Sequence, residues 1–175
     1  MDVFEAIRGR RSVRAYMREE VSNDMIMDLI DAARWAPSAG NVQPWEFIVV
    51  RSKNVKHMLA EAALHQTFIE EASAVIVVCA DEWRSARAYG LRGTQLYCIQ
   101  DTAAATQNML LAAYAKGLGT CWVGAFNEEK VSRVLSLPDR IRPVAIIPVG
   151  YPAEKPRPPR RRPLEDIVHY ERFYR

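Results

Sequence analysis

The sequence predicts a single domain that combines helices with one β-sheet, in an α+β or α/β arrangement. The length of 175 residues suits one domain, and 49% hydrophobic with 26% charged residues is typical of a globular chain. Apolar, strand-like runs are interspersed with segments of helical periodicity, and the sequence contains no internal repeat. We therefore expect one sheet with helical cover in a domain spanning residues 1–175.

The first third of the chain predicts two helices joined by a polar connector. Residues 3–9 have apolar residues at helical spacing, and Asp2 is suited to cap the first turn. A second helix is predicted from Ser22, and it should end before Pro37 because proline disfavours a helical residue in front of it. Residues 10–16, between the two helices, form a short connector rich in hydrogen-bond donors.

The middle of the chain alternates strands with loops and helices. Residues 37–44 hold Pro, Ser, Gly and Asn and are predicted to form a loop before the β-rich run Trp45–Val50. A helix over about 54–64 precedes Ala74–Ala80, which is apolar on both faces, as in a central strand covered by helices. Val144–Gly150 is predicted to be a further strand.

A long helix is predicted from about Thr94 to Lys116, and it is apolar nearly all round. Such a helix must be buried on most sides, which indicates a dimer interface in a chain of this size. Gly117 and Gly119 should terminate it. Residues 81–93, polar and aromatic, are expected to form an exposed excursion before it, and Asn127 should begin a further helix.

An extended C-terminal arm is expected at about 152–175. Residues 152–163 contain five prolines and five basic residues, which suits an extended segment rather than a packed element. The end of the chain, Leu164–Tyr174, regains apolar and aromatic residues and is expected to dock on another surface.

Composition and motifs exclude several classes of function. No nucleophile, phosphate-loop, dinucleotide or metal-ligand motif is present, so hydrolysis is poorly supported and no metal is expected. A net charge of +3 without a basic recognition helix or a stacking platform predicts no nucleic-acid partner. No signal peptide is visible, and no apolar run approaches the roughly 20 residues of a membrane helix. We expect a cytoplasmic protein with no membrane partner.

Two polar segments are suited to an anionic, planar ligand. Arg10, Arg11, Ser12 and Arg14 offer bidentate donors and a hydroxyl to a phosphate. The loop that follows the second helix adds neutral donors and acceptors that suit the pyrimidine-like edge of a flavin, namely Ser38, Asn41 and Gln43. The alternative for each segment is ordinary: a solvated basic connector and a simple turn.

Taken in order, the motifs resemble the FMN-dependent nitroreductase family. Residues 10–14 (RRSVR) and 36–45 (APSAGNVQPW) are similar to its N-terminal signature, including their spacing. Residues 99–113 resemble its long dimer helix, 117–122 (GLGTCW) the segment after that helix, and 160–165 (RRRPLE) its C-terminal phosphate-binding arm. The resemblance extends from about Phe4 to Phe173, nearly the whole chain.

The resemblance implies an α+β sandwich with a central, mainly antiparallel sheet flanked by helices, in an intertwined homodimer with FMN at the subunit interface. Arg10 and Ser12 would bind the phosphate and ribityl region, and Arg11 would contribute mostly through its backbone. Arg14 would lie near the pyrimidine side of the ring and stabilise negative charge on the reduced flavin. The other implied FMN contacts are Pro37, Ser38 and Asn41 from the second subunit, together with Gln66, Gly117, Gly119, Arg160 and Arg162.

The implied activity is that of a flavin oxidoreductase. NADH or NADPH would pass a hydride to FMN, and a nitroaromatic, a quinone or a similar electron-poor acceptor would then take its place in a ping-pong cycle. Residues 81–93 are the candidate substrate lid, with Trp83 and Tyr89 as gate residues or simply as caps on a hydrophobic edge. A flavin-cleaving or dehalogenating relative and a non-catalytic FMN-storage protein stay open as alternatives.

Overall fold

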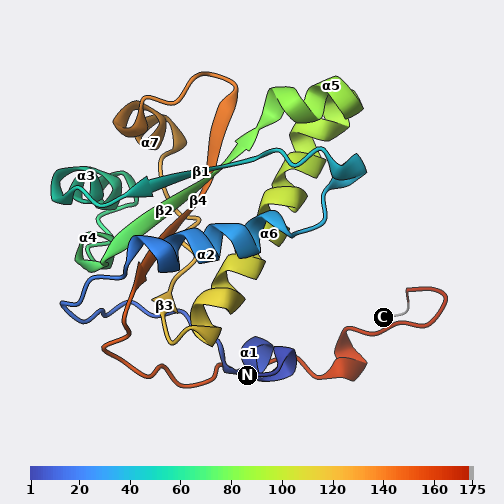
Figure 1. Cartoon of the computed structure of the whole chain (residues 1–175). Helices are drawn as coiled ribbons and strands as arrows, with labels where there is room; N and C mark the ends of the chain where they lie inside the picture. Colours follow the sequence, from blue (N-terminus) through green and yellow to red (C-terminus); the bar gives the residue numbers. More distant parts are fainter. Residues whose placement is uncertain (174–175) are drawn as a thin grey trace.

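The computed structural model describes residues 1–173 and shows one four-stranded sheet with helices on both faces (Figure 1). The strand order is β1 (Trp45–Val50), β2 (Ala74–Asp81), β4 (Ile141–Gly150) and β3 (Gly119–Thr120), and every neighbouring pair is antiparallel. The predicted α+β fold with a mainly antiparallel sheet is therefore confirmed.

Strand β2 carries the core on both of its faces. Its side chains alternate between two hydrophobic clusters: Val75, Val77 and Cys79 pack in one, and Ile76 and Val78 pack in the other. All five are fully buried, as expected for a central strand covered by helices. This burial raises the pKa of the Cys79 thiol to about 12, so the thiol is a neutral core group.

Two helical layers cover the sheet. Helices α2 (Asn23–Arg34) and α6 (Cys98–Ala115) supply the cluster on one face. Helices α3 (Lys53–Ala62), α4 (Phe68–Glu71) and α7 (Glu128–Leu135) supply the cluster on the other. The result is a three-layer sandwich in which α6 crosses the length of the sheet (Figure 1).

Local capping explains where the helices begin. Asp2 caps α1 (Val3–Gly9) with a full capping box, in which its carboxylate accepts from Phe4 N–H and Glu5 N–H. Ser22 caps α2 and Asn127 caps α7, each by accepting a backbone N–H three residues on. The predicted starts of these helices are confirmed.

The segment 81–93, expected to form an exposed excursion, contains a largely exposed helix that was not predicted. Helix α5 (Glu82–Arg92) begins on the side chain of Asp81, which accepts from the backbone N–H of Arg84 at 2.9 Å. The helix kinks at Gly90, where φ is 55°, and passes through a π-helical turn (Gly93–Tyr97) into α6. Apolar periodicity did not reveal α5 because the helix is largely exposed and fully buries only Ser85.

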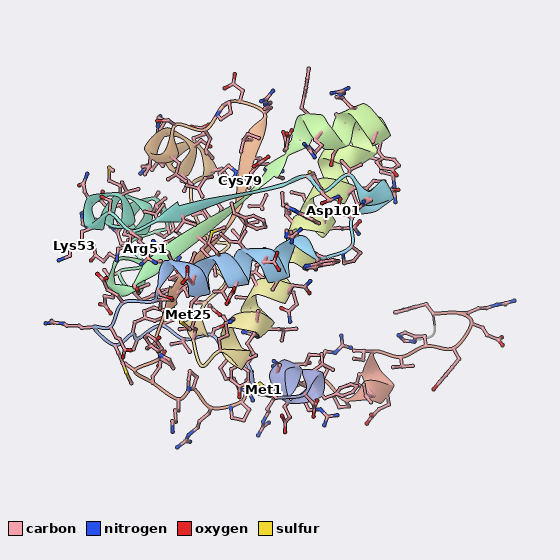
Figure 2. The ribbon with its side chains drawn as sticks, in the orientation of Figure 1. Met1, Met25, Arg51, Lys53, Cys79 and Asp101 are labelled. Carbon is pink, nitrogen blue, oxygen red and sulfur yellow. The ribbon has the colours of Figure 1, made fainter. Side chains whose placement is uncertain are left out.

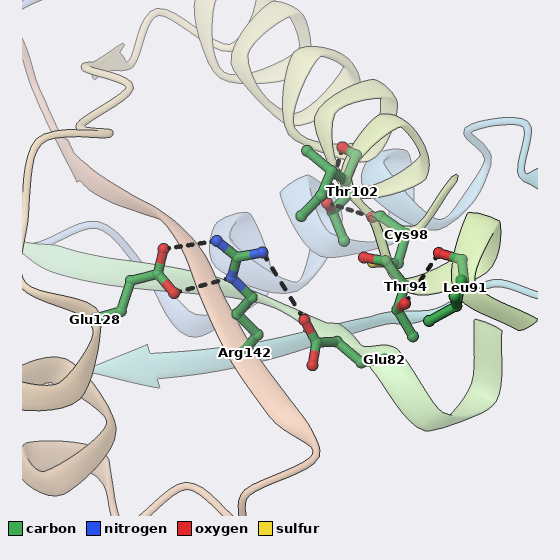
Figure 3. A network of polar contacts seen from close by, with 8 residues as sticks. Glu82, Leu91, Thr94, Cys98, Thr102, Glu128 and Arg142 are labelled. Carbon is green, nitrogen blue, oxygen red and sulfur yellow. Dashed lines mark hydrogen bonds and ion pairs between the residues drawn. The ribbon is translucent and has the colours of Figure 1, made fainter. Parts of the chain in front are cut away.

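An ion-pair network holds the start of α5 against the sheet (Figure 3). Arg142 of β4 makes two hydrogen bonds of 2.9 Å to the carboxylate of Glu128 on α7. A third nitrogen of the same guanidinium lies 3.8 Å from Glu82. The hydrogen bonds from Arg142 lower the pKa of Glu128 below its ordinary value.

The described part of the C-terminal arm contains one short helical element, the 3-10 turn η3 (Leu164–Asp166). It leaves β4 beside the connector that follows α1, where Ala153 N–H donates to Ala15 C=O at 2.9 Å. It then passes α1 and runs away from the body of the fold (Figure 1). The expected docking segment ends at Tyr174, which lies outside the described residues, and the described part of it exposes Leu164, Ile167, Val168, Tyr170 and Phe173 in the single chain.

Across the described ranges, no helix is long and apolar enough to cross a membrane.

Candidate functional site

The connector after α1 lies directly against the end of the sheet. Ser12 forms a parallel bridge with Thr120 of β3, and Val13 N–H donates to Thr120 C=O at 2.9 Å. Two glycines allow this close packing: a Cβ at Gly9 would lie 2.2 Å from the hydroxyl of Tyr114, and one at Gly119 would lie 2.9 Å from Val13. These contacts hold the connector in a fixed position against β3.

A groove of about 320 Å³ opens where three segments meet. These segments are the connector, the turn that follows α6, and the beginning of the C-terminal arm. Four of the predicted site residues border it, from two distant parts of the sequence. They are Arg10, Arg11, Gly117 and Gly119, and Thr120, Glu154 and Lys155 lie beside them.

The groove is positively charged and its guanidinium groups are not neutralised. Burial lowers the pKa of Arg10, and the positive charges of Arg11 and Arg161 lower it further. Within residues 1–173, no carboxylate lies within 4.0 Å of the guanidinium of any of these three residues. Arg11 donates to the backbone carbonyls of Arg8 and Arg10 at 2.6 and 2.7 Å, so its side chain folds back on the connector. Such a cluster is suited to bind an anion.

Arg14 and Ser12 lie next to the groove but do not line it. The guanidinium of Arg14 lies 5.8 Å from the ring centroid of Phe68, and its backbone N–H donates to Glu154 at 2.5 Å. The hydroxyl of Ser12 lies beside the thiol of Cys121. Burial raises the pKa of Cys121, while Arg14, Ser12 and Arg10 oppose this shift. By accepting the backbone N–H of Arg14, Glu154 attaches the arm to the connector.

Three further predicted contacts lie apart from the groove lining. Gln66 uses its amide to join the turn after α3 to the loop after β3, donating to Ala63 C=O at 2.9 Å and to Ala125 C=O at 3.1 Å. In the arm, Arg162 donates to the backbone of Asp166 at 2.7 Å, and Arg160 is exposed. Of the three consecutive arginines 160–162, Arg161 is the one whose charge lowers the pKa of Arg10.

The loop 37–43, which begins at Pro37, forms a second cluster of polar side chains. Ser38 accepts the backbone N–H of Gln43 at 3.0 Å, and the amide of Gln43 donates to the side chain of Asn41 at 3.1 Å. Asn41 and Gln43 have φ of 56° and 54°, and Gly40 between Ser38 and Asn41 has 54°. A Cβ at Gly40 would lie 2.2 Å from the hydroxyl of Tyr89 on α5. The three predicted polar residues therefore lie together in one tightly turned loop.

The two clusters lie at opposite ends of α6. The backbone of Ala39 contacts Asp101 in the first turn of α6, and Figure 2 shows Asp101 beside the 3-10 turn η1 (Ala39–Asn41). Gly117, in contrast, follows the last turn of the helix. At 1.5 Å per residue, the 18 residues of α6 separate the clusters by about 27 Å. A single small ligand cannot contact both clusters of one chain.

Comparison with known proteins identifies the family. Residues 7–151 match the family model described as the nitroreductase family. The chain belongs to the nitroreductase family. This match includes the connector, the loop 37–43 and the whole of α6, whereas Glu154 and Lys155 of the groove follow its end.

Relatives from the nitroreductase family match along nearly the whole chain. A Thermus thermophilus protein named NADH dehydrogenase is 35% identical, over 96% of this chain and 95% of the relative. A Bacillus subtilis protein named FMN reductase (NADPH) is 30% identical, over 99% of this chain and 74% of the relative. The structure of the NADPH:FMN oxidoreductase from Vibrio harveyi complexed with NAD⁺ has a TM-score of 0.90 at 25% identity, covering 98% of this chain and 78% of the other.

Sequence reasoning missed several residues that lie in or beside the two polar clusters. Glu154 and Lys155 line the groove, but a proline-rich arm gives no signal of what it packs against. Phe68 lies in a helix of only four residues, which is too short for periodicity to reveal. Asp101 could have been noticed as the only charged residue of α6, although its partner Ala39 lies 62 residues away in the sequence.

Proposed function

We propose that this chain is an FMN-dependent oxidoreductase that takes electrons from NADH or NADPH and reduces nitroaromatics, quinones or similar electron-poor acceptors in a ping-pong cycle. Family membership supports an NAD(P)H-dependent flavin oxidoreductase. The names of the relatives add FMN as the flavin and a nicotinamide nucleotide as the donor. To these we add the class of acceptor and the ping-pong order of the steps.

The observation that carries the proposal is the unneutralised arginine groove. FMN ends in a phosphate, and the groove offers the partly buried guanidinium of Arg10 at the end of the connector. Gly117 fits a ligand here as well, since its φ is 76° and a Cβ there would meet nothing within 4 Å, which leaves the backbone open. Donor chemistry and space therefore fit an FMN phosphate. Arg160 and Arg162 would approach from the arm, and Ser12 would lie beside the ribityl chain.

A second copy of the chain would complete the site. Because the loop 37–43 and the groove are separated by the length of α6, the loop of one copy would contact the flavin held by the other. Apolar surface left exposed in the single chain supports a homodimer: Val3, Phe4 and Ile7 of α1 are at least half exposed, at 59, 62 and 50%. Pairing would also cover the apolar end of the arm.

Side chains would act on the cofactor by charge and by shape. When bound, FMN supplies the two-electron chemistry that links the nicotinamide to the acceptor. Arg14 would place positive charge near the pyrimidine side of the ring and so favour the reduced cofactor. Helix α5, in contact with the loop 37–43 through Tyr89 and Gly40, would border the space that the nicotinamide and the acceptor occupy in turn. Trp83, 60% exposed on the same helix, is a candidate contact for the acceptor.

An absorption spectrum of the purified protein, recorded before and after NADH or NADPH is added without oxygen, tests the proposal. Flavin bands that bleach with either nucleotide, and that return faster with a nitroaromatic or a quinone than with air, would support it. Bound flavin that neither nucleotide reduces would favour a flavin-cleaving or dehalogenating relative. Reduced flavin that no acceptor oxidises faster than air would favour FMN storage. Failure to bind added FMN would overturn the proposal altogether.

A further inference from the structure

The loop 37–43 is joined to other segments by few hydrogen bonds. Within residues 1–173, its hydrogen bonds to other segments are two: Ala39 N–H donates to Asp101 Oδ1 at 3.1 Å, and Arg84 donates to Val42 C=O at 3.4 Å. The first joins the loop to the buried face of α6, and the second comes from the exposed helix α5. Asp101 therefore supplies the anchor in the core.

Asp101 is an unusual choice for a buried anchor. The residue is 6% exposed, and its other oxygen, Oδ2, is buried without a hydrogen-bond partner among the residues that the structure describes. A buried and half-satisfied carboxyl group destabilises a fold relative to a neutral side chain of the same shape. Burial also raises the pKa of Asp101, which reflects the same cost of desolvation. Stability alone therefore does not account for this residue.

We propose that Asp101 is a positioning residue that holds the loop 37–43 in the shape that presents Ser38 and Asn41 to FMN. It acts through the bond to Ala39, because this bond fixes the start of the 3-10 turn that follows Ser38 and contains Asn41. The inference rests on the proposed function, since it assigns to the loop a flavin bound by the partner copy. Asp101 does not contact the cofactor in this arrangement. It lowers the entropy that the loop loses on binding.

Titration of the flavin-free protein with FMN, alongside thermal unfolding without FMN, tests this role. Asp101→Ala is expected to weaken FMN binding at least tenfold while leaving the protein folded. Asp101→Asn keeps an acceptor for Ala39 N–H and is expected to restore binding to within about threefold of the parent. Thr106→Val is the matched control, because Thr106 is also buried in α6 but bonds only to the carbonyl of Thr102 in its own helix.

A second route removes the donor instead of the acceptor. Proline at position 39 lacks the N–H, and the extended backbone of Ser38 (φ −141°, ψ 155°) is the conformation that proline requires of its predecessor. Ala39→Pro should therefore weaken FMN binding, because it removes the donor and places Cδ where the N–H of Ala39 faces Asp101. The double variant with Asp101→Ala should bind no more weakly than the weaker single variant.

The outcomes separate the two proposals. An unaltered protein that fails to bind FMN overturns the proposed function. If it binds FMN, parent-like binding by Asp101→Ala, or equal weakening by Thr106→Val, overturns the role of Asp101. Failure of Asp101→Asn to restore binding overturns the role as an acceptor. If Asp101→Ala does not fold, the other two variants decide the question. Parent-like binding by Ala39→Pro, or weakened binding by Asp101→Asn, then overturns the role of Asp101.

Discussion

Replacement of Arg10 by glutamine should change FMN affinity and apo-protein stability in opposite directions. Arg10 lies partly buried beside the positive charges of Arg11 and Arg161, which lower its pKa. A hydrogen bond to a charged partner contributes about 1.5–3 kcal/mol, so the loss of the phosphate contact should weaken FMN binding by about 10- to 150-fold. Without FMN, removal of one of three clustered charges should stabilise the fold by about 0.5 kcal/mol.

The assay is a fluorescence titration with FMN, paired with urea unfolding of the flavin-free protein. Arg8→Gln is the matched control, because it removes the same charge two residues away. Arg8 is exposed, and its guanidinium lies 5.9 Å from the ring centroid of Phe4, outside the groove. Equal losses of affinity in both variants would show general attraction of an anion to a basic surface. Parent-like binding by Arg10→Gln would refute the assignment of the phosphate site.

Three further substitutions have outcomes that the structure specifies. Gly119→Ala places a Cβ 2.9 Å from buried Val13 and should destabilise the protein by about 1–3 kcal/mol in urea unfolding; an unchanged midpoint would show that the connector yields easily. Arg142→Met should cost about 0.5–1 kcal/mol at pH 7. Because the folded pKa of Glu128 is lowered, this difference should be complete above pH 4.5 and disappear as the pH falls through that lowered pKa; a difference independent of pH would contradict the ion pair. Arg14→Ala should lower the flavin midpoint potential in spectroelectrochemical titration, and an unchanged potential in the FMN-loaded variant would remove its tuning role.

The longer elements could be predicted from sequence because each carries a strong local signal. The run Ala74–Ala80 is apolar on both faces, and this is how β2 is buried. Asp2, Ser22 and Asn127 are helix caps whose side chains bond within three residues, so sequence and structure agree at these positions. Strand β3 has only two residues and exists through its pairing with β4, which no local pattern encodes.

The candidate site also has a part that the sequence predicts and a part that it does not. Arg10 and Arg11 were found because they cluster in the sequence near a helix end, and the grouping of Ser38, Asn41 and Gln43 follows from one short loop. The contacts that organise these groups join distant segments. Ala39 meets Asp101 across 62 residues, and Arg14 meets Glu154 across 140. Residue types indicate the chemistry of a site, whereas its assembly depends on tertiary packing.

Helix α6 is expected to couple assembly of the dimer to assembly of the flavin site. Its residues Ala105, Met109 and Ala113 pack in the core of the chain, whereas Ala103 and Leu111 are incompletely buried and lie outside that core cluster. A second copy covering this other face would explain why the helix is apolar nearly all round. Leu111→Glu should then place an unpaired charge in the interface twice, once from each copy, which costs several kcal/mol in total.

Sedimentation velocity and FMN titration of this variant provide the measurement. Leu111→Glu should be monomeric at micromolar concentration and should lose FMN affinity together with the dimer, because the loop 37–43 and the groove of one chain lie at opposite ends of α6, which is about 27 Å long. Leu64→Glu makes the same change at a leucine that is 68% exposed after α3, on the opposite layer, and should leave both properties unaltered. A monomeric Leu111→Glu that binds FMN like the parent would mean that one chain holds a complete site. In that case the separation of the two clusters along α6 would no longer argue for a shared one.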